Sequence, residues 1–488
     1  MLAQAQLRSS LPEPLRFRQV SGLAYDSRRV TRDSLFFAFP GAKTDGGCFV
    51  RQAMEAGAVA VVSELPPEGF SGPWIEVDHG RRTLSLACRN FFGPPEQSLD
   101  LNAVTGTNGK TTVAYLIDAI FRHRGHRTGL FGTIAHWIGE RRLPALNTTP
   151  ESLDLYDLFG MLREQAVTHV ALEVSSHALA LGRVYAIGFH TAVFTNLTRD
   201  HLDFHETMDA YFAAKSLLFQ ANGAPAPKFA VVNTDDDYGR RLQIAPETEA
   251  ITYGLREPAA LQAEQIKMDF SGVRFLLRHG RESAPVKSSL AGLVNVYNIL
   301  AACGVGIAHG WDLEMIADGI EKCAAVPGRF EKVDQGQPFL VVVDYAHTDD
   351  ALRNAIQVAR TLEPKRVITV FGCGGDRDRS KRPLMGQAAA QLSDHVVLTS
   401  DNPRSEDPLM IINDVLVGLR RLDTPHTVEP DRRRAIRLAL EQARTGDLIL
   451  VAGKGHETQQ TVKDEVIHFD DREVARELLS EMGYRRKQ

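Results

Sequence analysis

The sequence has 488 residues, of which 43% are hydrophobic and 24% are charged. This is an ordinary composition for a globular protein, and at roughly 150 residues per domain the length favours about three domains. With 56 lysines and arginines against 61 aspartates and glutamates, the formal net charge is −5, which argues against a nucleic-acid-binding protein. The five cysteines are scattered without a C-x-x-C pair, so neither a disulfide framework nor a zinc site is indicated.

Membrane insertion and secretion are not indicated either. No apolar run approaches the roughly 18–20 residues that cross a bilayer. The first segment, MLAQAQLRSSLPEPLRF, lacks the apolar core of a signal peptide. We therefore expect a soluble, cytoplasmic, multidomain protein with no membrane insertion.

The first part of the chain, residues 1–97, contains short apolar stretches separated by Gly, Pro and Asp, and a turn-rich segment at 92–96 marks its end. From residue 98 the pattern becomes regular. Strands are predicted at 101–104, 128–137, 168–174, 189–197 and 228–233, with a helix at 110–124. Strands that alternate with helices predict an α/β domain with a mainly parallel sheet covered on both faces.

The alternation of predicted strands and helices is interrupted near 325–328 and then resumes. Strands are predicted at 339–347, 366–372, 394–400 and 447–453, and helices at 349–362, 383–392 and 408–421. This is a second α/β pattern, so we expect three domains, 1–97, 98–326 and 327–488.

Residues 103–112 read AVTGTNGKTT, and the Gly-Lys-Thr at 109–111 matches the end of an ATP-binding phosphate loop. The common form, G-x-x-x-x-G-K-[ST], has a glycine where this chain has Val104. The segment nevertheless follows an apolar strand and opens a helix, so backbone N–H groups and the helix dipole face an anion there. Lys110 supplies a mobile charge and Thr111 a hydroxyl for Mg²⁺. The alternative is a glycine-rich turn with an incidental lysine, and phosphate binding is favoured over it.

Two further predicted strands end in polar residues. Glu173 closes one strand, and a cluster of Asp200, His201, Asp203 and His205 follows the next. Ligands in such sheets bind beyond the carboxyl ends of the strands, and carboxylates there suit Mg²⁺. His201 can equally be a hydrogen-bonding loop residue, and the two readings stay open.

The segment MDAYFAAKSLLFQ (208–220) predicts an amphipathic helix that carries Lys215. From this spacing alone, Lys215 is expected to cover apolar surface with its methylene groups and to expose its ammonium group to water.

Many segments, in order along nearly the whole chain, resemble those of the Mur ligase family. The family's phosphate loop, T-G-T-N-G-K-[ST], matches residues 105–111, which accounts for Val104. The other matching segments are DSR (26–28), NTTP (147–150), LEVSSHAL (172–179), TNLTRDHLDFH (195–205), YFAAKSLLF (211–219), NVYN (295–298), PGRFE (327–331), DYAHT (344–348), GCGGDRDRSKRP (372–383), DNPR (401–404) and GKGHE (453–457).

The resemblance implies a fold and an activity. The fold is a central phosphate-loop domain with a mainly parallel sheet, flanked by an N-terminal α/β nucleotide-sugar domain and a C-terminal Rossmann-like α/β domain. The activity is an ATP-dependent ligase of peptidoglycan precursor synthesis that adds the third peptide residue to UDP-N-acetylmuramoyl-L-alanyl-D-glutamate through an acyl phosphate. The implied partners are small-molecule substrates only, and the enzyme is expected to be a monomer.

The resemblance also implies site residues. For ATP these are Gly106, Thr107, Asn108, Gly109, Lys110, Thr111, Thr112, Asn295, Arg329 and Asp344. Two Mg²⁺ ions are implied, with Thr111, Glu173, His201 and a carbamylated Lys215 as ligands, and Lys110, Glu173, His201 and Lys215 as catalytic residues. Carbamylation turns the lysine into an anionic oxygen ligand, and this implication replaces the solvent-exposed reading.

For the UDP-linked substrate the resemblance implies Ser27, Ala42, Lys43, Thr44, Asn147, Thr148, Thr149, Ser175 and Arg183. The chain departs from the family pattern at Leu181, where many relatives carry Gln, so one substrate hydrogen bond is in doubt. Smaller departures are Val294, where Phe is usual, and Asp349, where Pro is usual.

The amino acid to be added is predicted from DNPR. meso-Diaminopimelate carries a second carboxylate that lysine lacks, and Arg404 offers a planar, bidentate donor for it. In the family, DNPR resembles the signature of the diaminopimelate-adding branch. The implied amino-acid contacts are Arg377, Asp401, Asn402, Pro403, Arg404, Gly453 and Glu457.

Other functions stay open from the sequence. The same ligase can use L-lysine, and a related ligase such as folylpolyglutamate synthetase shares parts of the pattern. From a different class, a P-loop kinase or switch ATPase would transfer phosphate to a hydroxyl or hydrolyse ATP without an amine. For the ligase, His205 or His347 is a candidate for removing a proton from the attacking amine.

Overall fold

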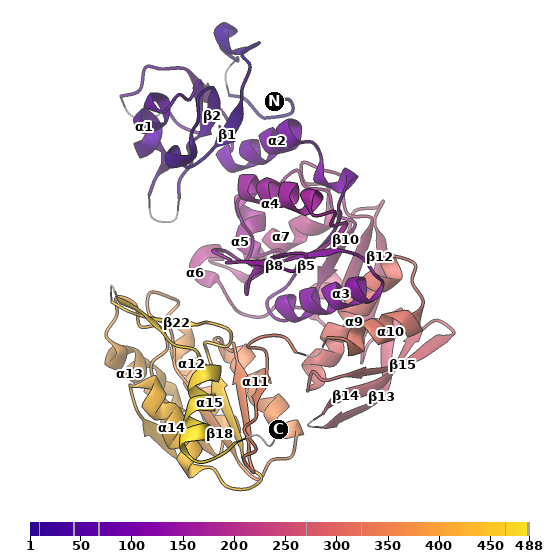
Figure 1. Cartoon of the computed structure of the whole chain (residues 1–488), viewed down its shortest axis with the longest axis vertical. Helices are drawn as coiled ribbons and strands as arrows, with labels where there is room; N and C mark the ends of the chain where they lie inside the picture. Colours follow the sequence, from indigo (N-terminus) through magenta and orange to yellow (C-terminus); the bar gives the residue numbers. More distant parts are fainter. Residues whose placement is uncertain are drawn as a thin grey trace.

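The computed structural model describes residues 1–8, 10–41, 44–66, 69–269, 271–323, 325–463 and 465–485. Three bodies follow one another along the chain, each built on its own sheet (Figure 1). Among the described helices, none has the length and apolar character that crossing a membrane requires.

The first body is a small parallel sheet with strand order β1-β2-β3-β4. Its strands are β1 (Gly22–Ala24), β2 (Ser34–Phe37), β3 (Ala60–Ser63) and β4 (Trp74–Glu76), and its helices are α1 (Val50–Glu55) and α2 (Gly80–Phe92). The strands β2 and β3 are buried throughout, as expected for a parallel strand with both faces covered.

The second body contains a large sheet with order β15-β14-β13-β12-β11-β10-β5-β9-β6-β7-β8. The parallel strands are β5 (Asp100–Thr105), β6 (Thr128–Phe131), β9 (His169–Glu173), β10 (Thr191–Phe194), β11 (Phe229–Asn233) and β12 (Glu249–Gly254). At one edge β7 (His136–Ile138) and β8 (Arg141–Leu143) continue the sheet antiparallel. At the other edge β13 (Leu261–Asp269) pairs parallel with β12, and β14 (Gly272–His279) and β15 (Glu282–Ser288) follow antiparallel. The predicted α/β fold with a mainly parallel central sheet is confirmed.

One predicted strand is wrong. Residues 128–137 do not form a single strand, because the chain turns after β6 and returns antiparallel as β7. The turn passes over the Glu173 side chain, which a Cβ atom on Gly132 would meet. The reversal therefore depends on a contact between two distant parts of the chain.

Helices cover both faces of the central sheet. The helices on one face are α3 (Lys110–His123), α9 (Leu293–Ala308) and α10 (Leu313–Glu321), and those on the other include α4 (Ser152–Glu164), α5 (Ser176–Leu181) and α7 (Met208–Ser216). Two short helices complete this body, α6 (Leu202–His205) and α8 (Asp237–Arg241). The apolar core of the α4 face continues through α2 into the first body, so these two bodies share one core.

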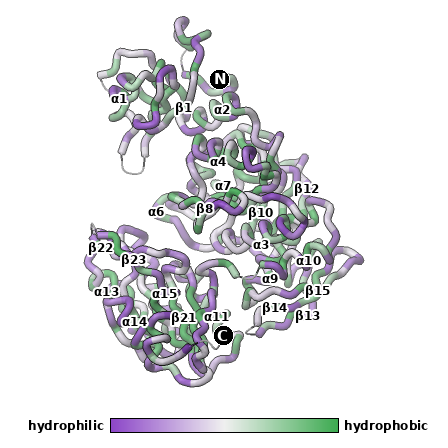
Figure 2. Tube along the Cα trace, in the orientation of Figure 1, coloured by the Kyte–Doolittle hydropathy of each residue, from purple (hydrophilic) through white to green (hydrophobic). Residues whose placement is uncertain are grey.

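The third body is a sheet with order β16-β17-β21-β18-β19-β20, parallel except at β16. Its strands are β16 (Glu331–Val333), β17 (Leu340–Asp344), β18 (Val367–Phe371), β19 (His395–Leu398), β20 (His426–Val428) and β21 (Leu448–Ala452), and a separate ribbon is formed by β22 (Gln459–Val462) and β23 (Glu465–His468). Its helices are α11 (Asp349–Thr361), α12 (Lys381–Leu392) and α13 (Pro408–Leu419) on one face, and α14 (Arg432–Gln442) and α15 (Asp471–Glu481) on the other. Figure 2 shows hydrophobic residues along the inner strands of this sheet and hydrophilic residues on the outer loops.

Candidate functional site

The phosphate loop lies between β5 and α3, at the carboxyl edge of the central sheet. Its two glycines have left-handed backbone conformations, with φ of 144° at Gly106 and 89° at Gly109. A Cβ atom on Gly106 would collide with Thr195, and one on Gly109 would collide with Asn298. Both positions therefore require glycine, whereas Val104 is a buried strand residue and not part of the loop.

The backbone of the phosphate loop is held by hydrogen bonds from Lys110 and from the residues that follow β10. The Nζ atom of Lys110 donates to the carbonyl oxygens of Gly106, at 2.9 Å, and Thr107, at 2.8 Å. The Asn108 carbonyl oxygen accepts hydrogen bonds from Thr195 Oγ1 at 2.6 Å and Asn196 Nδ2 at 3.1 Å. Burial lowers the pKa of Lys110. With its backbone held in place, the loop can receive a phosphate at the N-terminus of α3.

Glu173 joins the phosphate loop to the turn after β6. Its buried carboxylate accepts hydrogen bonds from Thr111 Oγ1 (3.0 Å), Thr133 Oγ1 (3.0 Å) and Thr133 N (2.9 Å). This set of carboxylate and hydroxyl oxygens fits Mg²⁺, which prefers oxygen ligands. Thr133 is missing from the sequence predictions, because nothing in the local pattern shows that the turn after β6 closes over Glu173.

Lys215 lies beneath the phosphate loop and is only 1% exposed. Its Nζ atom donates to the Gly106 carbonyl oxygen at 2.8 Å and lies 4.6 Å from the centroid of the Tyr211 ring. Burial, and then the charge of Lys110, hold the pKa of Lys215 well below its usual value. The spacing-based reading of a solvent-exposed lysine is therefore wrong, because α7 packs under the loop. A neutral, buried amine fits carbamate formation.

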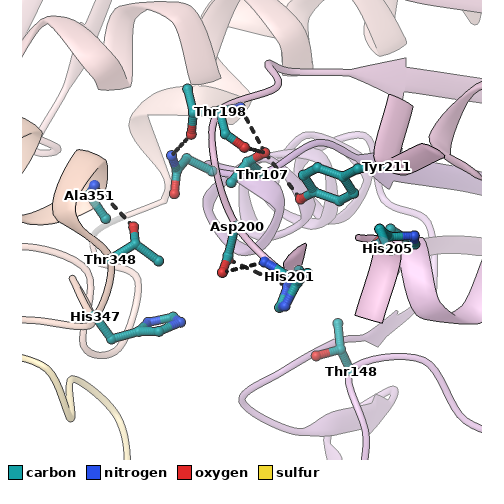
Figure 3. A network of polar contacts seen from close by, with 12 residues as sticks. Thr107, Thr148, Thr198, Asp200, His201, His205, Tyr211, His347, Thr348 and Ala351 are labelled. Carbon is teal, nitrogen blue, oxygen red and sulfur yellow. Dashed lines mark hydrogen bonds and ion pairs between the residues drawn. The ribbon is translucent and has the colours of Figure 1, made fainter. Parts of the chain in front are cut away.

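Asp200 and His201 follow β10 (Figure 3), and both line the larger cavity described below. His201 has a left-handed backbone conformation, with φ of 55°, and its N–H donates to Asp200 Oδ1 at 2.9 Å. Burial lowers the pKa of His201 to about 3 despite the Asp200 charge, so the ring is neutral at pH 7 and offers a lone pair. His205 instead pairs its Nε2 with Ser176 Oγ at 2.9 Å.

A cavity of about 440 Å³, the central cavity, lies between the second and third bodies. It is lined by residues of both, namely Asn147, Thr148, Ser175, His177, Arg183, Asp200, His201, Asp203, Tyr345, His347, Gly372, Cys373, Gly374, Arg377, Asp378, Lys381, Asp401, Asn402, Arg404, Gly453 and Glu457. In Figure 3, His347 and Thr148 flank this space on opposite sides. The cavity therefore brings together the residues predicted for the UDP-linked substrate and those predicted for the amino acid.

Two residues predicted to contact substrates, Thr149 and Pro403, do not line the central cavity. Thr149 is fully buried, and its Oγ1 donates to the Glu173 carbonyl oxygen at 2.8 Å. The Pro403 backbone lies against Gly375, whose missing side chain makes room for it. These two residues shape the wall of the cavity rather than line it.

The third-body end of the central cavity carries both acidic and basic groups, among them Glu457 and Arg404. Asn402 Nδ2 donates to Glu457 Oε2 at 2.8 Å, and burial raises the pKa of Glu457. Arg404 Nη1 donates to the Gly375 carbonyl oxygen at 2.7 Å, its one side-chain hydrogen bond within the described chain. The other N–H groups of Arg404 remain to bind an anion in the cavity.

A second, narrow cavity of about 100 Å³ is lined by Asn108 and Gly109 of the phosphate loop and by the predicted ATP residues Asn295, Arg329 and Asp344. Arg329 Nη2 donates to Thr111 Oγ1 at 3.0 Å. The Asp344 carboxylate accepts from two backbone N–H groups, and burial raises its pKa. This arrangement places a cation and a carboxylate beside the anion-binding loop.

The predicted uridine contacts lie apart from the central cavity, in the first body. Ser27 is buried and donates from Oγ to Gln52 Oε1 at 2.8 Å, whereas Thr44 is exposed. Ala42 and Lys43 fall outside the described residues.

Several cavity residues were not singled out from the sequence. These are Tyr345, Asp378 and Lys381. Lys381 and Asp378 lie in the segment GCGGDRDRSKRP, which resembles the family pattern. That resemblance could have identified both residues as candidate site residues.

A phosphate loop that lines a narrow cavity, together with a larger polar cavity, both shared by two α/β bodies, defines a nucleoside-triphosphate-dependent enzyme with a second substrate site. Residues 104–306 match the Mur ligase middle domain, residues 328–455 the Mur ligase, glutamate ligase domain, and residues 19–91 the Mur ligase family, catalytic domain. The chain belongs to the Mur ligase family.

Relatives and solved structures agree with this membership. A protein of Solibacter usitatus (strain Ellin6076), named UDP-N-acetylmuramoyl-L-alanyl-D-glutamate--2,6-diaminopimelate ligase, is 58% identical over 100% of this chain and 99% of its own length. A protein of the same name from Syntrophomonas wolfei subsp. wolfei is 47% identical over 95% of both chains. A solved structure of a ligase of this name is 35% identical, with a TM-score of 0.66 over 95% of both chains.

Proposed function

We propose that the chain is the ATP-dependent ligase that adds meso-2,6-diaminopimelate to the D-glutamyl γ-carboxylate of UDP-N-acetylmuramoyl-L-alanyl-D-glutamate in peptidoglycan precursor synthesis. Relatives that match the whole chain carry this name. The central cavity is the observation that supports it most directly, because Asn147 and Arg183 of the second body and Arg404 of the third body line the same space.

In this proposal each domain binds a different part of the substrates. The domains are residues 1–97, 98–326 and 327–488. The first holds the uridine end of the substrate, the second binds the phosphates of ATP, and the third supplies the amino-acid contacts. Action as a monomer is part of this proposal. The substrates, ATP and a nucleotide-linked sugar, point to the cytoplasm as the compartment of the reaction.

In the first chemical step the γ-carboxylate oxygen attacks the γ-phosphorus of ATP, the bond to the β-phosphate oxygen breaks, and an acyl phosphate and ADP form. Lys110 precedes Thr111 in the phosphate loop and Arg329 donates to Thr111 Oγ1, so both bring positive charge to the phosphates. Phosphoryl transfer depends mostly on such positioning and charge. Mg²⁺, for which Thr111, Glu173, His201 and a carbamylated Lys215 are the proposed ligands, supplies charge neutralisation at the phosphate oxygens when bound.

Lys215 becomes an oxygen ligand by reaction with dissolved CO₂. The neutral amine attacks the carbon atom, an N–C bond forms, and one proton leaves to solvent, so that an anionic carbamate results. The burial that lowers the pKa of Lys215 keeps the amine in the reactive, neutral form.

In the second step the amine of diaminopimelate attacks the acyl carbon, and the tetrahedral intermediate expels phosphate. The amine must lose a proton, and His347 is the better of the two candidate acceptors. It lines the central cavity, and burial lowers its pKa to about 4, so it is neutral at pH 7. His205 does not line the cavity and is engaged with Ser176.

Selection of diaminopimelate over L-lysine rests on Arg404 in this proposal. Its guanidinium group pairs with the second carboxylate, and the carboxylates of Asp401 and Glu457 receive the neighbouring ammonium group. L-lysine would leave these buried polar groups unpaired, which a site of this kind discriminates against strongly.

The test is phosphate release from ATP in the presence of UDP-N-acetylmuramoyl-L-Ala-D-Glu, with either meso-diaminopimelate or L-lysine. We expect release that depends on diaminopimelate and is at least about 100-fold weaker with L-lysine. Equal release with L-lysine would retain the ligase and reject the role of Arg404. Release that is independent of any amine would favour a kinase or switch ATPase.

A further inference from the structure

Four histidines gather at the edge of the central sheet opposite the phosphate loop. His169 begins β9, His190 precedes β10, and His309 and His126 follow α9 and α3. Asp100 begins β5, whose other end leads into the phosphate loop, so the cluster and the loop lie roughly 17 Å apart along that strand. The reaction proposed above uses none of these groups.

Three side chains of this cluster converge. A ring nitrogen of His190, a ring nitrogen of His309 and a carboxylate oxygen of Asp100 all lie within 4.8 Å of one another. Asp100 Oδ1 is 3.5 Å from His309 Nε2 and 3.9 Å from His190 Nδ1. Ligands bound tetrahedrally at about 2.0–2.2 Å from a metal lie about 3.4 Å apart, so these spacings are close to those of a metal site.

The carboxylate is held in position by a neighbouring residue. Asn102 is fully buried, and its Nδ2 donates to Asp100 Oδ1 at 2.8 Å. Outer contacts of this kind orient ligands in metal sites. The His190 and His309 rings are stacked with centroids 4.4 Å apart, so both nitrogens face one ion only after a ring rotation about χ2, which is a soft torsion in histidine.

Both ring nitrogens also have a polar neighbour. His309 Nε2 lies 3.3 Å from Asn102 Oδ1 and His190 Nδ1 lies 2.9 Å from Thr191 Oγ1, so a bound ion would replace these two contacts. All three side chains are partly open to solvent, with 17% exposure for His190, 7% for His309 and 25% for Asp100, which leaves an entry path and room for a water ligand.

We propose that Asp100, His190 and His309 form a second metal site, for a divalent transition metal ion of the Zn²⁺ type, with water completing the coordination. Two imidazoles and one carboxylate suit such an ion better than Mg²⁺, which prefers oxygen ligands. The bound ion ties the starts of β5 and β10 to the end of α9. Because it joins three elements that separate on unfolding, its binding stabilises the folded chain.

The test titrates the full-length protein with Zn²⁺ in excess Mg²⁺, and follows Co²⁺ by its visible absorption, which is intense only in tetrahedral sites. We expect that H190Q and D100N each lose one equivalent of bound ion, or bind it at least about 100-fold more weakly, and lose the Co²⁺ bands. H123Q, which changes an exposed histidine at the end of α3, and H201Q, which changes the phosphate-loop edge, keep this equivalent.

Trp311 provides a second readout, because its ring is stacked on His309 at a centroid distance of 4.9 Å. Cu²⁺ bound at the cluster quenches the Trp311 fluorescence in the wild type and not in H190Q, and the quenching disappears in W311F. Zn²⁺ also raises the Tm of the wild type but not that of H190Q or D100N, and phosphate release by H190Q stays unchanged without added Zn²⁺. Equal Zn²⁺ stoichiometry and equal Cu²⁺ quenching in wild type, H190Q and D100N would overturn the proposal, whatever the outcome of the ligase assay.

Discussion

At the scale of single residues, Lys215 shows how a fold changes the chemistry of a side chain. The same lysine on an exposed helix would be a solvated cation, but here it is enclosed between the phosphate loop and Tyr211. Burial makes its charged form unfavourable, and the nearby charge of Lys110 adds to this effect. The consequence is an amine available for reaction at neutral pH.

Replacing Lys215 by alanine tests that consequence. Because an anionic ligand near the phosphates is lost, we expect K215A to lower kcat by about 100-fold or more, with the fold retained. A small carboxylate such as acetate should restore part of the kcat. The measurement is phosphate release with and without acetate, and K267A, which changes an exposed lysine in β13, serves as the matched control. Activity of K215A equal to that of K267A would remove the lysine from the mechanism.

His456 makes stability depend on pH. Its ring lies 4.8 Å from that of Tyr345, and within the described chain its buried Nδ1 has no hydrogen-bond partner. Burial, and then the charge of Arg329, lower its pKa to about 3. Because the folded pKa lies below the unfolded value of 6.5, the stabilisation is complete above about pH 6.5 and is lost as the pH falls towards 3.

Replacing His456 by glutamine should reduce this pH dependence. Each buried histidine of this kind contributes a slope of about 1.4 kcal/mol per pH unit below pH 6.5. We therefore expect the urea midpoint of wild type to fall more steeply between pH 6.5 and 4.5 than that of H456Q. The control is H426Q, at an exposed histidine, which should follow the wild-type profile. Identical slopes for wild type and H456Q would show that the ring is solvated.

At the scale of secondary-structure elements, the first turn of α11 docks onto the phosphate loop. Thr348 caps the helix by accepting from Ala351 N at 3.2 Å (Figure 3). Asp350 Oδ2 accepts from Asn108 Nδ2 at 2.8 Å and from Thr198 Oγ1 at 3.1 Å. Asp349, which replaces the usual proline, occupies the first helical position, where an acidic side chain suits the helix dipole.

Asp350 should therefore position the phosphate loop for ATP. Removing a charged hydrogen-bond acceptor costs about 1.5–3 kcal/mol, so D350A should raise the KM for ATP by about 10- to 100-fold. D349A is the matched control, because it removes an acidic side chain from the same helical turn without touching Asn108. A KM for ATP that is the same in the two variants would show that Asp350 stabilises only the helix.

The predicted elements agree with the structure where a strand or helix is long and locally patterned. The strands predicted at 101–104, 228–233 and 447–453 correspond to β5, β11 and β21. The strand predicted at 128–137 is wrong, because its turn depends on Glu173. The ribbon β13–β15 was not predicted, although its strands alternate polar and apolar residues, which is typical of strands with one face open to solvent.

At the scale of the whole molecule, both cavities exist only because the second and third bodies meet. The connection runs through Gly328, whose backbone has a φ of 66°. A Cβ atom there would collide with the backbone of His456 and Gly455, in the GKGHE segment that contributes to the central cavity. Gly328 therefore permits the close approach of the segment that joins the two bodies and the segment that carries Glu457.

Replacing Gly328 by alanine should disturb both stability and catalysis. The left-handed conformation costs about 1–2 kcal/mol for alanine, and the collision adds about 1–3 kcal/mol. G125A is the matched control, because Gly125 has a φ of 88° and open space around its Cβ position. We expect G328A to show the lower Tm and a higher KM for diaminopimelate, and G125A to show only a small loss of Tm. Equal effects would mean that the joining segment adapts.

The sequence by itself determined the α/β alternation, the phosphate loop and the family to which the chain belongs, because these depend on local patterning and on motifs that stay intact in order. The tertiary structure decided which distant residues meet. The enclosure of Lys215, the closure of Thr133 over Glu173, and the convergence of His190 and His309 on Asp100 each join segments far apart along the chain. Burial and long-range contact set the charge state and the partners of these groups, and the spacing of residues along a sequence does not encode either.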